Sequence, residues 1–134
     1  MLFRSVDRAA GVAADSGAKL LIICAYHPQK DTGDAEAALG EDAYMVVGSA
    51  PAEQTLNSAK DRAAKAGLGA DHIDTRAVEG DPVEVVTKVV SDAKAELVVI
   101  GNKGLNSLAG RLLGSVPQSI SRQSSVDVLI VHTT

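Results

Sequence analysis

A glycine-rich stretch near the end of the chain has the composition of a phosphate-binding loop. Residues 101–116 read GNKGLNSLAGRLLGSV and follow the apolar run AELVVI without a spacer. Glycine lets backbone N–H groups turn toward a ligand, because it has no Cβ to obstruct them. A group of such donors close to the start of a helix favours an anion, and Ser115 adds a hydroxyl donor beside Gly114. The stretch therefore predicts a cradle for a phosphate group.

The spacing of these glycines differs from that of several common catalytic and nucleotide-binding motifs. The chain has no G-x-x-x-x-G-K-[ST], which excludes the loop of P-loop NTPases, and no G-x-G-x-x-G after its first apolar run, which disfavours a nicotinamide dinucleotide site. It has no G-x-S-x-G elbow and no histidine near Ser115 in the sequence, which argues against a serine hydrolase. What stands here is Gly101, two residues, Gly104, nine residues, then Gly114 and Ser115.

Other residues that could carry chemistry form no recognisable site. The three histidines are scattered and have no metal-ligand spacing, so no metal site is expected at His27, His72 or His132. The acidic segment 30–42 could bind a cation, but a solvated acidic loop is the simpler interpretation. The side chains of Lys103 and Arg111 could reach a phosphate or could equally be exposed charges.

Composition and charge limit the functions open to this chain. Its 134 residues suffice for one packed domain, expected over 1–134. The net charge of −4 disfavours nucleic acid as a partner, because affinity for a phosphate backbone requires clustered lysine and arginine. The apolar runs are too short to span a bilayer and nothing resembles a signal peptide, so we expect a cytoplasmic protein without membrane contact. The single cysteine, Cys24, lies in an apolar run, which favours a buried, inert thiol.

The elements that must position the glycine-rich stretch are alternating strands and helices. Apolar residues make up 46% of the chain and aromatic residues only 2%, which is typical of an aliphatic core between helices and a parallel sheet. The order α-β-α-β-α-β-α-β predicts right-handed crossovers and an α/β fold with helices on both faces of an open, twisted parallel sheet. Strands are expected at 18–26, 72–80, 96–101 and 126–133; helices at 2–14, 49–67, 81–95 and 116–125; and a long loop, with one short helical turn, at 28–49.

The spacing of apolar residues also predicts which helix faces are buried. For the first helix these are Leu2, Val6, Ala9 and Ala13. The second helix is expected to begin at Ser49 as N-cap and to end at Gly67, with a buried face of Ala52, Leu56, Ala59, Ala63 and Ala66. The third begins with Asp81 as N-cap and Pro82 in its first position, with a buried face of Val83, Val86, Val90 and Ala93.

The glycine spacing resembles the G-x2-G-x9-G-[ST] signature of the adenine-nucleotide-binding branch of the universal stress protein family. All four motif positions match, and the resemblance continues in GDPVEVV, LVVIGNKG and VDVLIVHT, so that it covers nearly the whole chain. It is strongest toward actinobacterial members that bind cyclic AMP as well as ATP, in the stretches AGRLLGSVP and VDVLIVHTT. The resemblance implies a Rossmann-like fold and ATP or cyclic AMP as ligand, with Mg²⁺ as a possible companion of ATP.

The family's nucleotide contacts can be transferred to matching positions of this chain. Gly101, Gly104, Gly114 and Ser115 resemble the residues that contact phosphate and ribose. Val116 resembles a residue that touches the nucleotide through its backbone. Ala25, near the end of the strand at 18–26, resembles the residue beside the adenine, where a small side chain lets a flat ring lie close to the backbone.

One family element has no counterpart in this sequence. Members of the family usually open with a strand that lies in the middle of a five-stranded sheet and ends in an acidic turn. Here MLFRSVDRAAG resembles the helix after that strand. The strands at 18–26 and 96–100 would then lack a partner between them, which leaves buried backbone groups unpaired. We therefore expect either that residues precede Met1 in the natural chain, which we favour, or that another segment fills the position.

Three functions from different classes are compatible with these observations. The first is a regulatory or nucleotide-buffering protein of the stress response that binds ATP or cyclic AMP and has at most weak ATP hydrolysis, because no general base or metal cluster accompanies the cradle. The second is a nucleotide-cleaving or nucleotide-transferring enzyme of the same fold group, although neither S-G-G-x-D-S nor H-x-G-H is present. The third is a dimeric scaffold with an empty pocket. The apolar last strand, 127–132, is expected at a sheet edge, and the resemblance implies a homodimer through it.

Overall fold

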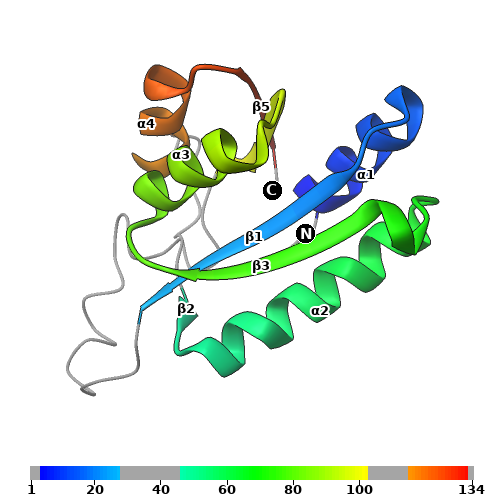
Figure 1. Cartoon of the computed structure of the whole chain (residues 1–134), viewed down its shortest axis with the longest axis horizontal. Coiled ribbons are helices and arrows are strands. Elements are labelled where there is room, and N and C mark those ends of the chain that lie inside the picture. Colours follow the sequence, from blue (N-terminus) through cyan, green and yellow to red (C-terminus); the bar gives the residue numbers. More distant parts are fainter. Residues whose placement is uncertain (1–3, 28–45, 103–114, 133–134) are drawn as a thin grey trace.

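Helices and strands alternate along the chain as the apolar pattern predicts. The computed structural model describes residues 4–27, 46–102 and 115–132. The helices are α1 (Arg4–Ser16), α2 (Ser49–Lys65), the short 3-10 helix η3 (Ala70–His72), α3 (Pro82–Ala93) and α4 (Ser115–Gln123). The strands are β1 (Leu20–His27), β2 (Val46–Val47), β3 (Ile73–Glu79), β4 (Leu97–Gly101) and β5 (Asp127–Val131) (Figure 1). The predicted α/β class is confirmed. The two-residue β2, at the end of the predicted 28–49 loop, is an addition, and the rest of that loop up to residue 45 lies outside the described residues.

All strand pairs are parallel, but the strands form two sheets. β1 pairs with β3 from Leu20 to Tyr26 and with β2 only at Tyr26 and His27. β4 pairs with β5 over its whole length. Within the described ranges no ladder joins β1 to β4. This arrangement agrees with the expectation that the strands at 18–26 and 96–100 lack a common neighbour.

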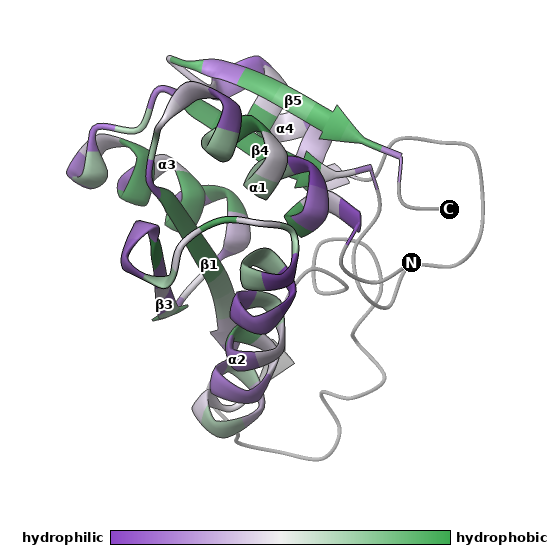
Figure 2. Cartoon of the chain, turned by 90° about the vertical axis from the view of Figure 1, so that its right-hand side faces the viewer, coloured by the Kyte–Doolittle hydropathy of each residue, from purple (hydrophilic) through white to green (hydrophobic). Residues whose placement is uncertain are grey.

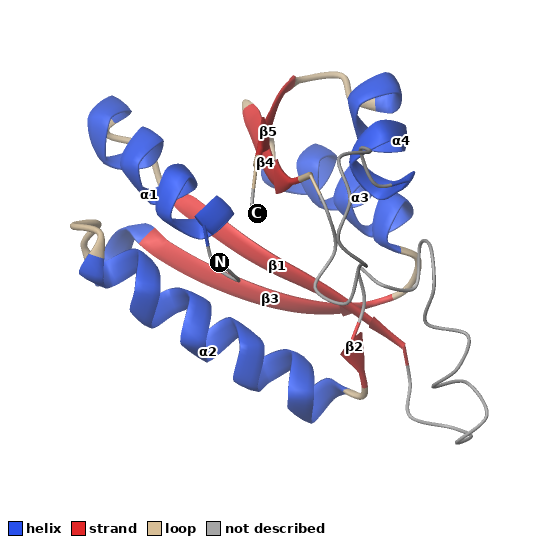
Figure 3. Ribbon diagram, turned by 180° about the vertical axis from the view of Figure 1, so that it is seen from behind, coloured by secondary structure: helices blue, strands red, loops and turns tan. Residues whose placement is uncertain are grey.

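Helices cover both faces of the strands. α1 and α2 contact each other and β1, and α1 also contacts β4 and β5. α3 contacts β1 and α4, and α4 contacts β5. Figure 3 shows α2 along one side of β1 and β3, with α3 and α4 on the other side and α1 beside the start of β1, and the side chains of α1 and α2 share a core cluster that does not include α3. The two sheets are therefore held between the same two helix layers.

The continuous apolar run in β1 packs against helices on both faces of the strand. Leu20 and Ile22 pack on the cluster that α1, α2 and the start of β3 form from Ala10, Ala13, Ala63, Leu68 and Ile73. Leu21 and Ile23 pack on the opposite cluster, where Ala25 meets α3. Because successive strand residues point to opposite faces, a strand covered on both sides must be apolar at every position. Figure 2 shows β1 mainly in the hydrophobic colour, whereas hydrophilic residues alternate along the ribbon of α2.

The predicted face of α2 is correct for four of its five residues, but its predicted N-cap is wrong. Ala52, Leu56, Ala59 and Ala63 are buried, whereas Ala66 is exposed because the helix ends at Lys65. Gly48, not Ser49, is the N-cap, with a φ of 92°. Its N–H donates to the carbonyl of His27 at 2.6 Å. The turn from β2 into α2 therefore requires a positive φ, which glycine adopts readily. The predicted stop is confirmed, since Gly67 has a φ of 107° just past the helix.

For α3 the predicted start is confirmed and the predicted face is wrong. The carboxylate of Asp81 accepts hydrogen bonds from the N–H groups of Val83 and Glu84, both at 3.1 Å, and Pro82 begins the helix. The buried residues are Pro82, Val85 and Val89. The predicted stripe is only half-buried at Val83, Val86 and Val90, and Ala93 is exposed. The helix carries two adjacent valine stripes, and the stripe against Ala25 of β1 is the buried one.

The helix α1 buries Ala9 and Ala13, as predicted, together with Ala10, while Val6 is half-buried. Leu2, which the prediction placed on the same face, lies outside the described residues. None of the helices in the described ranges is long and apolar enough to cross a membrane.

Candidate functional site

The candidate site lies where strands end and helices begin. In open parallel sheets, ligands bind beyond the carboxyl ends of the strands. β3 ends at Glu79 shortly before α3 begins, and β4 ends at Gly101, the last strand residue before α4. β1 and β3 end on the left of Figure 1, on the side of the molecule where α4 lies, and α3 connects the two regions through contacts with β1 and α4.

Ala25 occupies the predicted place near the end of β1. Its side chain is 8% exposed and packs against Val85 and Val89 of α3. A larger residue here would push α3 away from β1, because core positions tolerate added volume poorly. The packing against α3 therefore requires a small residue at this position.

The side chain of Cys24, next to Ala25, is half-buried. The predicted burial of this thiol is therefore only partly correct. Burial, and then the negative charge of Glu53, raise the pKa of the Cys24 thiol above its usual value. A raised pKa leaves little of the reactive thiolate at neutral pH. The Cys24 thiol is therefore mainly protonated at neutral pH.

Gly101 and Asn102 form the end of β4. Gly101 pairs with Val131 of β5, and the N–H of Asn102 then donates to the carbonyl of Val131 at 2.9 Å. Asn102 is 4% exposed, the only buried polar residue in the described part of the chain. Buried polar groups are normally hydrogen-bonded, and Asn102 is the last described residue after β4. The sequence analysis missed Asn102, although a polar residue directly after a buried strand was a signal.

Ser115 and Val116 begin α4. Ser115 is the first helical residue and is exposed, while Val116 is 1% exposed and points into the core with Pro117 and Ile120. The first four N–H groups of a helix have no partner within it, and the helix dipole gives this end a partial positive charge. The start of α4 thus offers a hydroxyl and backbone donors to an anion. The anchored side chain of Val116 fits the expectation that this residue acts through its backbone.

The remaining predicted site residues lie outside the described residues. These are Gly104 and Gly114, together with the two cations of uncertain role, Lys103 and Arg111. The structure therefore positions the two ends of the glycine-rich stretch, Gly101 and Ser115, and Ala25 in the neighbouring sheet. In the described ranges no group of three histidine, cysteine, aspartate or glutamate side chains could hold a metal ion.

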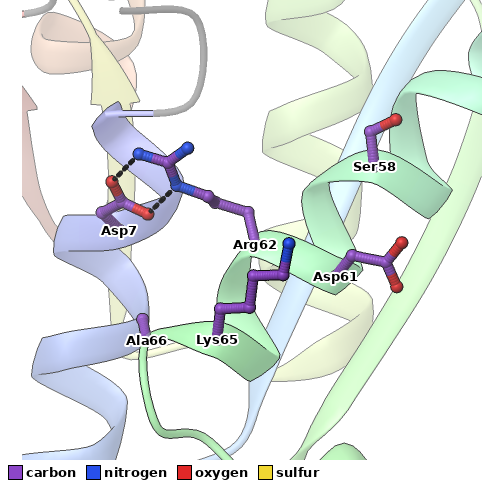
Figure 4. A pocket seen from close by; sticks show the side chains of 6 residues that line it. All are labelled: Asp7, Ser58, Asp61, Arg62, Lys65 and Ala66. Carbon is purple, nitrogen blue, oxygen red and sulfur yellow. Dashed lines mark hydrogen bonds and ion pairs between the residues drawn. The ribbon is translucent and has the colours of Figure 1, made fainter.

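A cavity of about 610 Å³ lies elsewhere, between α1 and α2 (Figure 4). Its lining is polar, with Asp7, Ser58, Asp61, Arg62, Lys65 and Ala66. The guanidinium of Arg62 donates to both carboxylate oxygens of Asp7, at 2.8 and 2.9 Å. This ion pair joins α1 to α2, and the two carboxylates of the lining, Asp7 and Asp61, balance the charges of Arg62 and Lys65, which leaves no excess of positive charge for an anionic ligand. The cavity is therefore a structural junction and a poor nucleotide site.

Comparison with known proteins identifies the class of protein to which this fold and this glycine spacing belong. The model of the universal stress protein family matches residues 3–132. The chain therefore belongs to the universal stress protein family, and the resemblance predicted from its motifs is confirmed.

Three members of the family show how similar this chain is to individual proteins. A universal stress protein of Mycobacterium tuberculosis is 47% identical over 131 residues, which cover 98% of this chain and 88% of that protein. A universal stress protein crystallised in complex with cAMP is 46% identical, with a TM-score of 0.72 over 98% of this chain and 89% of its own. A universal stress protein from Archaeoglobus fulgidus, at 17% identity and a TM-score of 0.69 over 96% and 87% of the two chains, shares the fold alone.

Proposed function

We propose that this protein binds an adenine nucleotide, ATP or cAMP, at the glycine-rich stretch between β4 and α4. The observation that carries the proposal is the complete motif, Gly101, Gly104, Gly114 and Ser115, in a chain 46% identical to a universal stress protein crystallised with cAMP. The described geometry supports it, because β4 ends and α4 begins at the two ends of the motif.

The role that we propose is regulatory or nucleotide-buffering, within the stress response and in the cytoplasm. The sequence around the glycine-rich stretch has no histidine near Ser115, and the described residues include no group of three side chains that could hold a metal ion. We therefore propose at most weak ATP hydrolysis. We also propose that any Mg²⁺ arrives with the phosphates of ATP, since Mg²⁺ commonly binds through phosphate oxygens and a few carboxylates.

A homodimer through β5 is part of this proposal. β5 pairs with β4 along one edge, and in the described ranges its other edge has no strand beside it. Its residues Val128, Leu129 and Ile130 are apolar and only half-buried. An apolar edge strand of this kind is a pairing surface unless something covers it, and a two-fold pairing of identical edges would cover it.

Titration calorimetry with ATP, ADP, cAMP and GTP, each with and without Mg²⁺, tests the proposed function. Saturable heat with ATP or cAMP and none with GTP would support adenine-nucleotide binding. Turnover of ATP faster than a few per hour would favour the alternative of an enzyme of the same fold group. No heat with any nucleotide, from a folded sample, would favour the alternative of a scaffold with an empty pocket.

A further inference from the structure

The residue that follows β4 is an asparagine whose burial has a cost. Asn102 is 4% exposed and is the only polar residue that is buried in the described ranges. The strand before it, LVVIG, is entirely apolar. Transfer of an amide out of water is unfavourable unless its donors and its acceptor find hydrogen-bond partners. An aliphatic residue would avoid this cost, so a specific set of hydrogen bonds must offset it at this position.

The backbone of Asn102 joins the ends of two strands. Its N–H donates to the carbonyl of Val131, the last residue of β5, at 2.9 Å. Asn102 also takes part in a further interaction, and in the described part of the chain no buried side-chain nitrogen or oxygen lacks a hydrogen-bond partner. The residue is therefore fixed by more than its own backbone.

Asn102 lies where it can couple the two ends of the glycine-rich stretch. It directly follows Gly101, the first glycine of the motif. β5, to which it is bonded, contacts α4, and α4 begins at Ser115. Figure 3 shows β4 and β5 side by side, with α4 close to them. One path of contacts thus runs from Gly101 through β5 to Ser115 without following the chain between them.

This path is built from well-packed residues. Val131 is 5% exposed, and Val116, the second residue of α4, is 1% exposed. Buried groups of this kind hold their neighbours in a single arrangement, because protein interiors are close-packed. A site whose groups are already in place binds more tightly, since the free energy of ordering them is not lost on binding.

We propose that Asn102 is a positioning residue of the candidate nucleotide site. Its hydrogen bonds hold the end of β4 against β5, and this sets the place of Gly101 relative to the donors at the start of α4. Because it is buried, Asn102 acts through these groups and not by contact with the ligand. The inference rests on the proposed nucleotide binding and adds a residue that the glycine motif does not contain.

Two substitutions of Asn102 and a distant control test this proposal. Ile73→Val is the control, because Ile73 is 5% exposed in the core cluster formed with α1 and α2, away from α4. Titration calorimetry with ATP and with cAMP is made well below each denaturation midpoint, and urea titration reports stability. We expect Asn102→Ala to lower nucleotide affinity by about tenfold, which corresponds to about 1.4 kcal/mol. Asn102→Ser, which keeps a donor and an acceptor, should recover part of this loss, and Ile73→Val should bind like the unchanged protein although its urea midpoint falls.

The outcomes separate positioning from stability. Equal affinity of Asn102→Ala and the unchanged protein, or an equal loss in Ile73→Val, would overturn the proposal, because Asn102 would then act on stability alone. If Asn102→Ala did not fold, Asn102→Ser would decide, and a folded serine variant with unchanged affinity would overturn it. Absence of heat with the unchanged, folded protein would refute the proposed function and this inference with it. Binding by the unchanged protein with no loss in either variant would refute this inference alone.

Discussion

Replacement of Ser115 by alanine tests the proposed site through a single hydroxyl group. Ser115 is the first residue of α4 and is exposed, so the substitution opens no cavity. The buried residues behind it, Val116 and Pro117, keep their packing. A change in affinity therefore reports the lost hydrogen bond rather than a damaged helix.

The size of the effect follows from the charge of the ligand and the exposure of Ser115. A hydrogen bond to a charged group contributes about 1.5–3 kcal/mol. Because water competes at an exposed position, we expect the lower end of this range. Affinity for ATP or cAMP should then fall by about tenfold, which corresponds to about 1.4 kcal/mol.

Ser121 provides the matched control for this measurement. It lies on the same helix, is exposed, and its hydroxyl donates to the carbonyl of Gln118 at 2.8 Å. Titration calorimetry should show Ser121→Ala binding like the unchanged protein, and thermal denaturation should show both variants folded. If Ser115→Ala bound as tightly as Ser121→Ala, the start of α4 would not contact the phosphate and the assignment of this loop would be wrong.

Three further predictions concern stability and assembly. Asp81→Ala removes the acceptor at the start of α3 and should lower the free energy of unfolding by about 1 kcal/mol in a urea titration. Replacement of the exposed Asp92 by alanine is the control and should leave the free energy of unfolding unchanged. Equal urea midpoints for the two variants would contradict the capping role of Asp81. Hydrogen bonding to Arg62 lowers the pKa of Asp7 in the folded protein. The ion pair therefore stabilises the fold fully above the pKa of Asp7 in the unfolded chain, about 3.9, and this stabilisation is lost as the pH falls through the lower pKa of the folded protein. Asp7→Asn should therefore lower the denaturation midpoint at neutral pH, and this difference should vanish in strong acid; a difference that persisted there would have another cause. The protein should be a dimer in light scattering at micromolar concentration and Ile130→Lys should be a monomer; a monomer before substitution would refute pairing through β5.

The sequence predicted correctly those parts of the fold that depend on interactions between residues close together in the chain. The helix α3 begins where Asp81 and Pro82 predict, because a carboxylate that accepts from the next free N–H groups and a ring with a fixed φ act within one turn. The run LLIICA is a strand because an unbroken apolar sequence suits a strand with both faces covered. The same logic located the glycine-rich stretch after β4, since only residue types and spacing were needed.

The predictions that were wrong or missing concern features that depend on contacts between residues distant in the sequence. Gly48 caps α2 in place of Ser49 because the preceding β2 pairs with the end of β1, 20 residues away, with Val46 opposite Tyr26 and Val47 opposite His27. Periodicity could not select between the two valine stripes of α3, since the choice depends on where β1 presents Ala25. Asn102 is buried, and its N–H donates to the carbonyl of Val131 in β5, a contact between segments on either side of α4. In each case the deciding partner is distant in the sequence.

The two helix starts closest to the candidate site differ in a way that favours one of them for an anion. α3 and α4 contact each other, and each begins after the carboxyl end of a strand. The first N–H groups of α3 are occupied by the carboxylate of Asp81, which also places a negative charge at that helix start. The residue before α4 is Gly114, which has no side chain to occupy the donors there, and the helix opens with the exposed hydroxyl of Ser115. An anion that approaches this edge would be repelled at α3 and favoured at α4, so the difference between the two helix starts supports the proposal that the phosphate binds at the glycine-rich stretch.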